Sequence, residues 1–184
     1  MYTGCFFYIR PDKEKQMKLD FRLLPALFFF GCNVKNSCQR ITVDNGLLDS
    51  VKKKMDTSYS KAYRSQEFAT AEYYINEKDS TVCQLMRDTA NQIRQVIIAK
   101  KEKKIFTAEY YANGQLKARL PFDNSGNLNG EGEFYFETGC VKSKGVFHNG
   151  LYYGQWENYD QSGKHVSTDQ YDINGQLIKT LKQK

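Results

Sequence analysis

The stretch YYANGQLK (residues 110–117) returns near the C-terminus as YDINGQLIK (residues 171–179). In both copies a tyrosine precedes Asn-Gly, and a leucine follows two residues behind the glycine. Asn-Gly favours positive φ at both central residues of a turn, which is the geometry of a type I′ β-hairpin. We therefore expect hairpin turns at Asn113–Gly114 and at Asn174–Gly175, as two copies of one strand–turn unit.

Between these copies, glycines recur at intervals of 11 to 13 residues: Gly114, Gly126, Gly139, Gly150, Gly163 and Gly175. An aromatic residue precedes most of them by three or four positions. Each interval has room for one strand and its bends, and aromatic pairs across neighbouring strands would stabilise the sheet. The sequence predicts a mainly β fold over residues 65–184, an antiparallel β-meander of about 12-residue units. Gly154 is grouped with the turn glycines.

Upstream of Tyr110 the repeat continues in a weaker form. MRDTANQIRQV carries Asn91 where later units carry glycine, and asparagine tolerates a left-handed backbone better than other non-glycine residues. AKKEKK (residues 99–104) is interpreted as a charged hairpin tip or edge.

The N-terminal residues have the layout of an export signal. MKLDFR is followed by the apolar run LLPALFFF and then by Gly31-Cys32. The run is too short to span a membrane but fits the apolar region of a signal peptide. It resembles a bacterial lipoprotein signal, in which Cys32 is lipidated and becomes the mature N-terminus, although Phe29 and Phe30 replace the usual leucine and small residue. We expect a signal at residues 1–31 with Met17 as the true start and residues 1–16 as a mis-assigned extension; the alternative is a buried segment of a cytosolic protein.

Residues 32–64 are expected to form a tether and a short amphipathic helix. Leu47, Leu48, Val51 and Met55 follow a helical spacing. The three lysines at positions 52–54 lie mostly off this stripe, as a solvated face or as a contact to anionic lipid.

The cysteines do not form a disulfide scaffold or a metal site. If Cys32 carries lipid, the mature chain keeps Cys38, Cys83 and Cys140, which allow at most one intramolecular disulfide. No CxxC occurs, and no cysteine or histidine has metal-ligand spacing. We predict no metal and no cofactor.

Three stretches carry a resemblance to a known family: YYANGQLK, NGEGEFYFETGCVK and HNGLYYGQWENYDQSGK. They look like the MORN-like repeats of the bacterial YwqK-type family, often labelled as antitoxins, over about residues 105–180. The resemblance implies a repeat β-sheet that binds another molecule. The antitoxin label implies a cytosolic toxin as the partner.

The motifs of common enzymes are absent, since the chain has no GxGxxG, P-loop, HExxH or GxSxG. Glu131 and Glu133 would share a strand face, as glycosidase carboxylates can, but solvated strand acids are the simpler interpretation. His148 and His165 stand beside turns. We therefore predict no catalytic residue.

The aromatic cluster Tyr152, Tyr153 and Trp156 is the candidate binding surface, suited to sugar rings or a peptide. The competing interpretation is that these side chains form the hairpin core. Aromatic residues with Lys117, Lys142 and Lys144 could also serve nucleic acid, but an exported location argues against it.

These features together predict a non-enzymatic, lipid-anchored protein of the bacterial cell envelope that binds a protein or peptide partner. The alternative is a cytosolic antitoxin-type protein, and the third is a protein that binds or hydrolyses cell-wall polymer.

Overall fold

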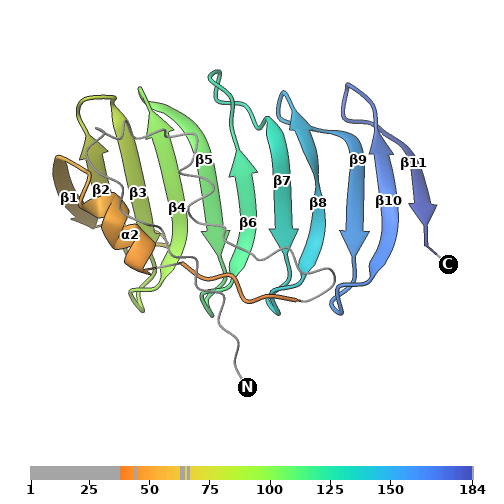
Figure 1. Ribbon diagram of the computed structural model, residues 1–184, viewed down its shortest axis with the longest axis horizontal. Coiled ribbons are helices and arrows are strands. Elements are labelled where there is room, and N and C mark those ends of the chain that lie inside the picture. Colours follow the sequence, from red (N-terminus) through yellow and green to blue (C-terminus); the bar gives the residue numbers. More distant parts are fainter. Residues whose placement is uncertain (1–37, 44, 63–64, 66, 184) are drawn as a thin grey trace, which may run out of the picture.

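The computed structural model describes residues 38–43, 45–62, 65 and 67–183. These residues form one antiparallel sheet of eleven strands whose spatial order is the order of the chain. Figure 1 shows the strands side by side from β1 to β11, with the helix α2 (Asn45–Lys52) in front of β2 and β3. The predicted mainly β meander is confirmed.

The first six strands are β1 (Thr57–Ala62), β2 (Thr70–Asn76), β3 (Thr81–Arg87), β4 (Ile93–Lys100), β5 (Lys103–Tyr110) and β6 (Leu116–Pro121). The remaining five are β7 (Gly130–Tyr135), β8 (Val141–His148), β9 (Leu151–Tyr159), β10 (His165–Tyr171) and β11 (Leu177–Lys182). β1 lies within residues 32–64, where the sequence predicted only a tether and a helix. Its residues TSYSKA are all exposed, so the strand has no alternation of apolar and polar residues from which it could be predicted.

Six of the turns share one five-residue geometry. The N–H of the first residue donates to the C=O of the fifth residue, and the N–H of the fourth residue donates to the C=O of the first. These turns cover residues 88–92, 111–115, 123–127, 136–140, 160–164 and 172–176. The positive φ falls on the fourth residue, such as Gly114 at 79° and Gly175 at 73°, and not on Asn113 or Asn174. This is a type I turn followed by a left-handed residue. The predicted type I′ turns are therefore wrong at both Asn-Gly-Gln-Leu copies, because one more residue separates the strands there.

Type I′ geometry occurs where a two-residue loop joins directly opposed strand ends. Asn149 and Gly150 have φ of 51° and 86° between the paired residues His148 and Leu151. Lys101 and Glu102 have φ of 48° and 65° at the end of the β4–β5 hairpin, which confirms the predicted charged tip.

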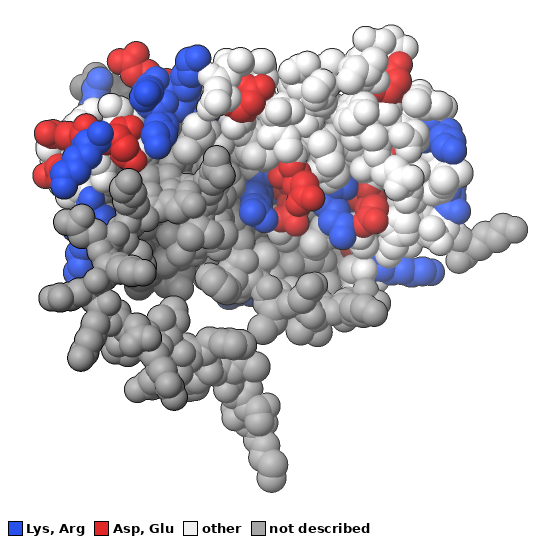
Figure 2. All heavy atoms as spheres, turned by 45° about the horizontal axis from the view of Figure 1, so that its top comes forward, with Lys and Arg blue, Asp and Glu red and all other residues white. Residues whose placement is uncertain are grey.

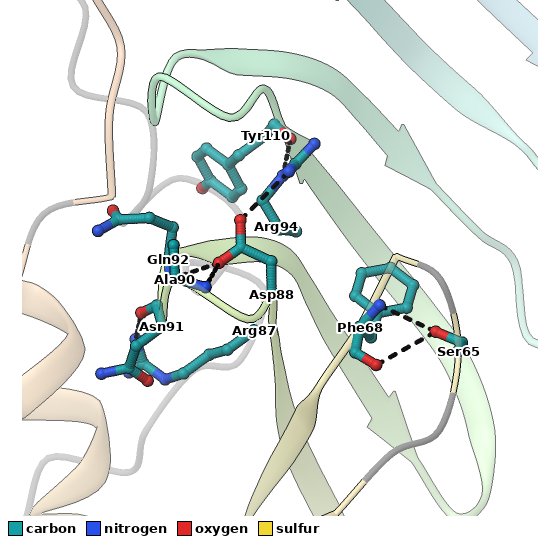
Figure 3. A network of polar contacts seen from close by, with 9 residues as sticks. All are labelled: Ser65, Phe68, Arg87, Asp88, Ala90, Asn91, Gln92, Arg94 and Tyr110. Atoms are coloured by element: carbon teal, nitrogen blue, oxygen red, sulfur yellow. Dashed lines mark hydrogen bonds and ion pairs between the residues drawn. The ribbon is translucent and has the colours of Figure 1, made fainter.

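The weaker upstream copy is also a turn of the common type. Asn91 has φ 61° and donates its N–H to the carbonyl of Asp88. Figure 3 shows the Asp88 carboxylate accepting the N–H groups of Ala90 and Gln92 and facing Arg94. Burial alone would raise the pKa of Asp88, but the Gln92 amide and the Arg94 guanidinium outweigh it and the pKa lies below its usual value. The interpretation of Asn91 as a replacement for glycine is confirmed.

Gly154 does not lie in a turn. It sits inside β9 with φ 67°, where the register with β8 shifts between Lys144 and Val146. Between the pairs Lys144–Glu157 and Val146–Tyr153, β9 has two more residues than β8, and a left-handed glycine helps the strand absorb such a β-bulge.

The main core lies between one face of β3–β6 and residues of the segment 41–55, which includes α2. Its buried cluster is Leu48, Val51, Cys83, Leu85, Val96, Ile98, Phe106, Ala108, Tyr110, Leu116 and Tyr135. Burial raises the pKa of the Cys83 thiol to about 12. Nearly all of these residues precede β7, so the core belongs to the first half of the sheet.

Residues 38–43, called the strap below, cross the lower ends of the middle strands in Figure 1. A disulfide joins Cys38 to Cys140 in the β7–β8 turn. Further along, the Ile41 N–H donates to Gln115 Oε1 at 3.0 Å, and the Leu116 N–H donates to the Ile41 carbonyl at 2.7 Å. The strap is thus held at Cys38 and again at Ile41, upstream of α2.

Candidate binding surface

Five aromatic rings gather on one face of β7–β10: Phe134, Phe147, Tyr152, Trp156 and Tyr171. The centroid of Trp156 lies 4.9 Å from that of Phe147 and 4.4 Å from that of Tyr152. Tyr152 also stacks on Tyr171 at 5.3 Å. Trp156 is only 2% exposed, while Tyr152 is 40% exposed. Trp156 is therefore the centre of a small core, and Tyr152 is its outer layer.

Two strand glycines make room for this cluster. A Cβ on Gly132 would lie 2.3 Å from the Phe147 ring, and one on Gly145 would lie 2.5 Å from the Trp156 ring. The rings can therefore lie flat on the backbone, and the Trp156 indole N–H donates to the Val146 carbonyl at 3.0 Å. This half of the sheet buries aromatic surface without a covering helix among the described residues.

The three predicted surface residues do not form one surface. Tyr153 points to the face opposite Tyr152, where its ring lies 5.5 Å from that of His148. Since Trp156 is buried, Tyr152 and Tyr153 are exposed on different faces of one strand. The hairpin-core interpretation fits Trp156.

The face that carries Tyr153 has a repeated polar cluster that was not predicted from the sequence. Glu133 Oε2 accepts hydrogen bonds from Tyr135, two residues on, and from Arg119 on β6. Glu157 is bound in the same way by Tyr159 and lies 3.1 Å from Lys144 Nζ on β8. Charged atoms of both signs alternate over the middle of the face in Figure 2. The recurring pattern Glu-x-Tyr, with a cation on the preceding strand, was visible in the sequence at these positions.

A third cluster of this kind joins β2, β3 and α2. Glu72 accepts from Arg87 Nε at 2.6 Å and from the Tyr74 hydroxyl at 2.7 Å, with Lys52 at 4.0 Å. Burial raises the pKa of Glu72, but the hydrogen bonds from Arg87 and Tyr74 bring it below its usual value. At Glu157 the hydrogen bond from Tyr159 is the main cause of a lowered pKa. Each of the three glutamates forms an ion pair with a basic side chain on a neighbouring strand, and these pairs stabilise the contact between the strands.

A shallow groove of about 360 Å³ runs along this face over β7–β9. Its lining residues are Glu131, Gly132, Glu133, Lys144, Gly145, Val146, Gln155 and Glu157. Glu131 and Glu133 thus share a face, as predicted, but Glu133 is engaged by Arg119 and Tyr135. Within the described part of the chain, no group of His, Cys, Asp and Glu could hold a metal ion.

The other predicted residues have structural places. His165 contacts Thr168 and the ring of Tyr159, and His148 contacts Asn149 and Tyr153. Lys117 and Lys144 pair with Glu109 and Glu157, and Lys142 lies over the Phe136 ring. Gly126, Gly139 and Gly163 hold the positive φ of their turns.

Cys32 and the predicted signal lie outside the described residues. None of the helices in the described part is long and apolar enough to cross a membrane.

Exposed apolar side chains are concentrated at the C-terminal end of the sheet. Among the residues that the structure describes, nine of the ten large exposed ones follow β7: Val146, Leu151, Tyr152, Tyr153, Val166, Ile173, Leu177, Ile178 and Leu181. The exception is Tyr59 on β1. We call these nine residues the open surface; they occupy both faces of this end of the sheet, since Tyr152 and Tyr153 point to opposite faces. Exposed apolar residues that lie together mark interaction sites more often than scattered ones do.

Comparison with known proteins supports the repeat and little more. Residues 108–124, around the first Asn-Gly-Gln-Leu copy, match the MORN repeat variant. The chain thus contains a MORN-like repeat, although the matched segment is too short to establish membership of a family. No curated protein matches.

The similar solved structures are larger proteins. They include accessory secretory protein 1, 2 and 3 of Streptococcus pneumoniae, at 19% identity and TM-score 0.34 over 52% of this chain. Another is TarM, at 14% identity and TM-score 0.33 over 74% of this chain. A third is S. aureus TarM with Fondaparinux, alpha-GlcNAc-glycerol and UDP, at 14% identity and TM-score 0.34 over 86%. This chain spans 18%, 24% and 27% of theirs, respectively. These similarities carry no conclusion about activity.

Proposed function

We propose that this protein is a non-enzymatic binding module of the bacterial cell envelope, anchored by a lipid on Cys32, which recruits a protein or peptide partner through its open surface. The observation that carries the proposal is the concentration of exposed apolar side chains on β8–β11, where Ile178 reaches 60% exposure. A rigid repeat sheet with one unshielded apolar end suits a scaffold, because little conformational entropy is lost on binding.

The location outside the cytosol is supported by the Cys38–Cys140 disulfide. Disulfides persist in oxidising compartments and are rare in the cytosol. Cys38 also follows the proposed lipidated residue closely, since six residues reach at most about 20 Å. The disulfide would therefore hold the domain near the membrane surface. This argues against the cytosolic antitoxin-type alternative.

Fractionation of cells that express the wild type or Cys32→Ala tests the anchor. We expect the wild type in the membrane fraction and the Cys32→Ala protein outside it. Wild-type protein in the cytosol with reduced Cys38 and Cys140 would contradict the proposed location.

The binding role is tested by cross-linking in native membranes followed by reconstitution with the purified partner. The variant replaces four exposed residues of the open surface, Tyr153, Ile173, Ile178 and Leu181, by serine. We expect it to lose the partner, while Tyr59→Ser, at the other end of the sheet and 52% exposed in the wild type, retains it. Equal recovery by the folded fourfold variant would contradict the proposal.

A further inference from the structure

Among the described residues, no strand pairs with the outer edge of β11, which leaves a defined set of its backbone groups directed outward. β11 is antiparallel to β10, and the Gln183 N–H donates to the Val166 carbonyl at 2.9 Å. In an antiparallel pair, hydrogen-bonded residues alternate with residues whose N–H and C=O point away from the partner strand. Leu181 and Lys179 therefore face β10, whereas Lys182, Thr180 and Ile178 direct their backbone groups outward.

The side chains of this edge combine apolar surface with positive charge. Leu177, Ile178 and Leu181 are 54%, 60% and 52% exposed. Lys179 and Lys182 are exposed too, and residues 176–183 contain no acidic residue. The opposite edge is different, because β1 is TSYSKA and its one large apolar residue, Tyr59, stacks on Tyr73 at 4.7 Å. β11 is thus the apolar and basic edge of the sheet.

This charge pattern disfavours pairing between two copies of β11. An antiparallel pair centred on Lys179 would place two lysines opposite each other, and no register could supply an acidic partner. Like charges directly opposite each other destabilise a strand pair, and lysines on edge strands commonly prevent such association. An acidic strand would instead gain two favourable cross-strand pairs.

We propose that the β11 edge binds an extended segment of a partner protein as an additional antiparallel strand, and that this segment is acidic and apolar. The inference rests on the proposed binding function and names the chemistry of its partner. Opposite Lys182 and Lys179 the segment carries carboxylates, and opposite Leu181, Ile178 and Leu177 it carries aliphatic residues. From its N-terminus the recognised pattern reads acidic, apolar, any, acidic, apolar, apolar. Backbone hydrogen bonds then supply affinity and the alternating side chains specificity.

The direct test uses the full chain and the blocked peptide Glu-Val-Thr-Glu-Val-Val, with hydrogen exchange and chemical shifts of the β11 amides as the readout. We expect the peptide to protect the outward N–H groups of Ile178, Thr180 and Lys182. A matched peptide with lysine in place of both glutamates should bind at least tenfold more weakly. Equal binding of the two peptides, or no binding of either, would overturn the inference.

A pair of variants at Thr180 separates edge pairing from side-chain contacts. The Thr180 hydroxyl donates to Asp169 Oδ1 at 2.6 Å, so both Thr180→Pro and Thr180→Val lose that bond. Only the proline removes the outward N–H, a position at which edge strands tolerate it. We expect Thr180→Val to bind within about twofold of the wild type and Thr180→Pro to bind at least tenfold more weakly. If the folded Thr180→Pro protein binds like Thr180→Val, the peptide does not pair with this edge.

Reversing the charge of the edge gives a gain of function. The double variant Lys179→Glu and Lys182→Glu should prefer the lysine peptide over the glutamate peptide. Unchanged preference would overturn the assignment of the two lysines.

Two further outcomes separate this inference from the proposed function. If Thr180→Pro still recovers the native partner and the fourfold variant of the open surface does not, the proposed function stands and the edge inference fails. A concentration-dependent dimer in sedimentation that Thr180→Pro abolishes would assign the edge to a second copy and overturn the inference.

Discussion

One sheet contains two halves that use the same strand–turn unit but bury their residues differently. In β2–β6, the covered half, the buried side chains meet α2 and the strap on one face. In β7–β11, the open half, the rings of Phe147 and Trp156 lie on strand glycines of the other face, and most of the remaining apolar side chains are exposed. The Cys38–Cys140 disulfide joins the strap to the β7–β8 turn, next to the boundary between the halves.

The difference shows that a repeat of turns does not decide what covers a sheet. Gln115 and Gln176 illustrate this difference in coverage, since they occupy the same position in the two Asn-Gly-Gln-Leu copies. Gln115 is 1% exposed and binds the strap, whereas Gln176 is exposed. The same local sequence supports a contact in one half and solvent in the other.

The largest expected effect separates the two halves by stability. Leu85→Ala should lower the free energy of unfolding by about 2–5 kcal/mol, because Leu85 is fully buried in the covered half and a cavity would remain. Leu181→Ala, at 52% exposure in the open half, should change it by less than about 0.5 kcal/mol. Urea unfolding measures both. Similar losses at the two sites would show that the open half is buried in solution.

The boundary between the halves is tested by removing the disulfide. Replacing Cys38 and Cys140 by serine should cost about 2–4 kcal/mol, because the bond closes a long loop in the unfolded chain, with a sequence separation of 102. Urea unfolding without reductant gives the value. As the control, reductant should destabilise the wild type and leave the double variant unchanged; a wild type insensitive to reductant would contradict the role of the disulfide.

The two repeat copies allow a matched comparison of one residue type. Gln115→Ala should cost about 1–3 kcal/mol, because it leaves the Ile41 N–H without its acceptor. Gln176→Ala serves as the control and should be nearly neutral, since Gln176 is exposed. Thermal unfolding of the two variants measures the difference. Equal effects would mean that the strap does not depend on Gln115.

The smallest effect concerns the type I′ turns at residues 101–102 and 149–150, one in each half. The open half has Asn149–Gly150, while the covered half holds Lys101 and Glu102 at positive φ. Lys101→Asn with Glu102→Gly should raise stability by about 1 kcal/mol, because left-handed backbone costs other residues roughly that amount. The alanine pair at these positions removes the charges without relieving the backbone. If it stabilises as much in thermal unfolding, charge and not geometry is the cause.

The sequence by itself determined the meander, the position of each repeat turn and the charged tip at residues 99–104. Turns depend on local chemistry, since positive φ selects Gly or Asn and an Asp side chain can bind the next N–H groups. For this reason Asn91 could be recognised even without its glycine. The turn type was not determined, because it depends on how the two flanking strands pair.

Tertiary structure alone decided which cysteines join, which glutamine is buried and which face each aromatic residue occupies. These outcomes depend on the cross-strand register and on contacts across many tens of residues, which no local pattern encodes. Tyr152 and Tyr153 are adjacent in sequence, yet the two-residue period of a strand places them on opposite faces. Gly145 acquires its role only because register brings Trp156 above it.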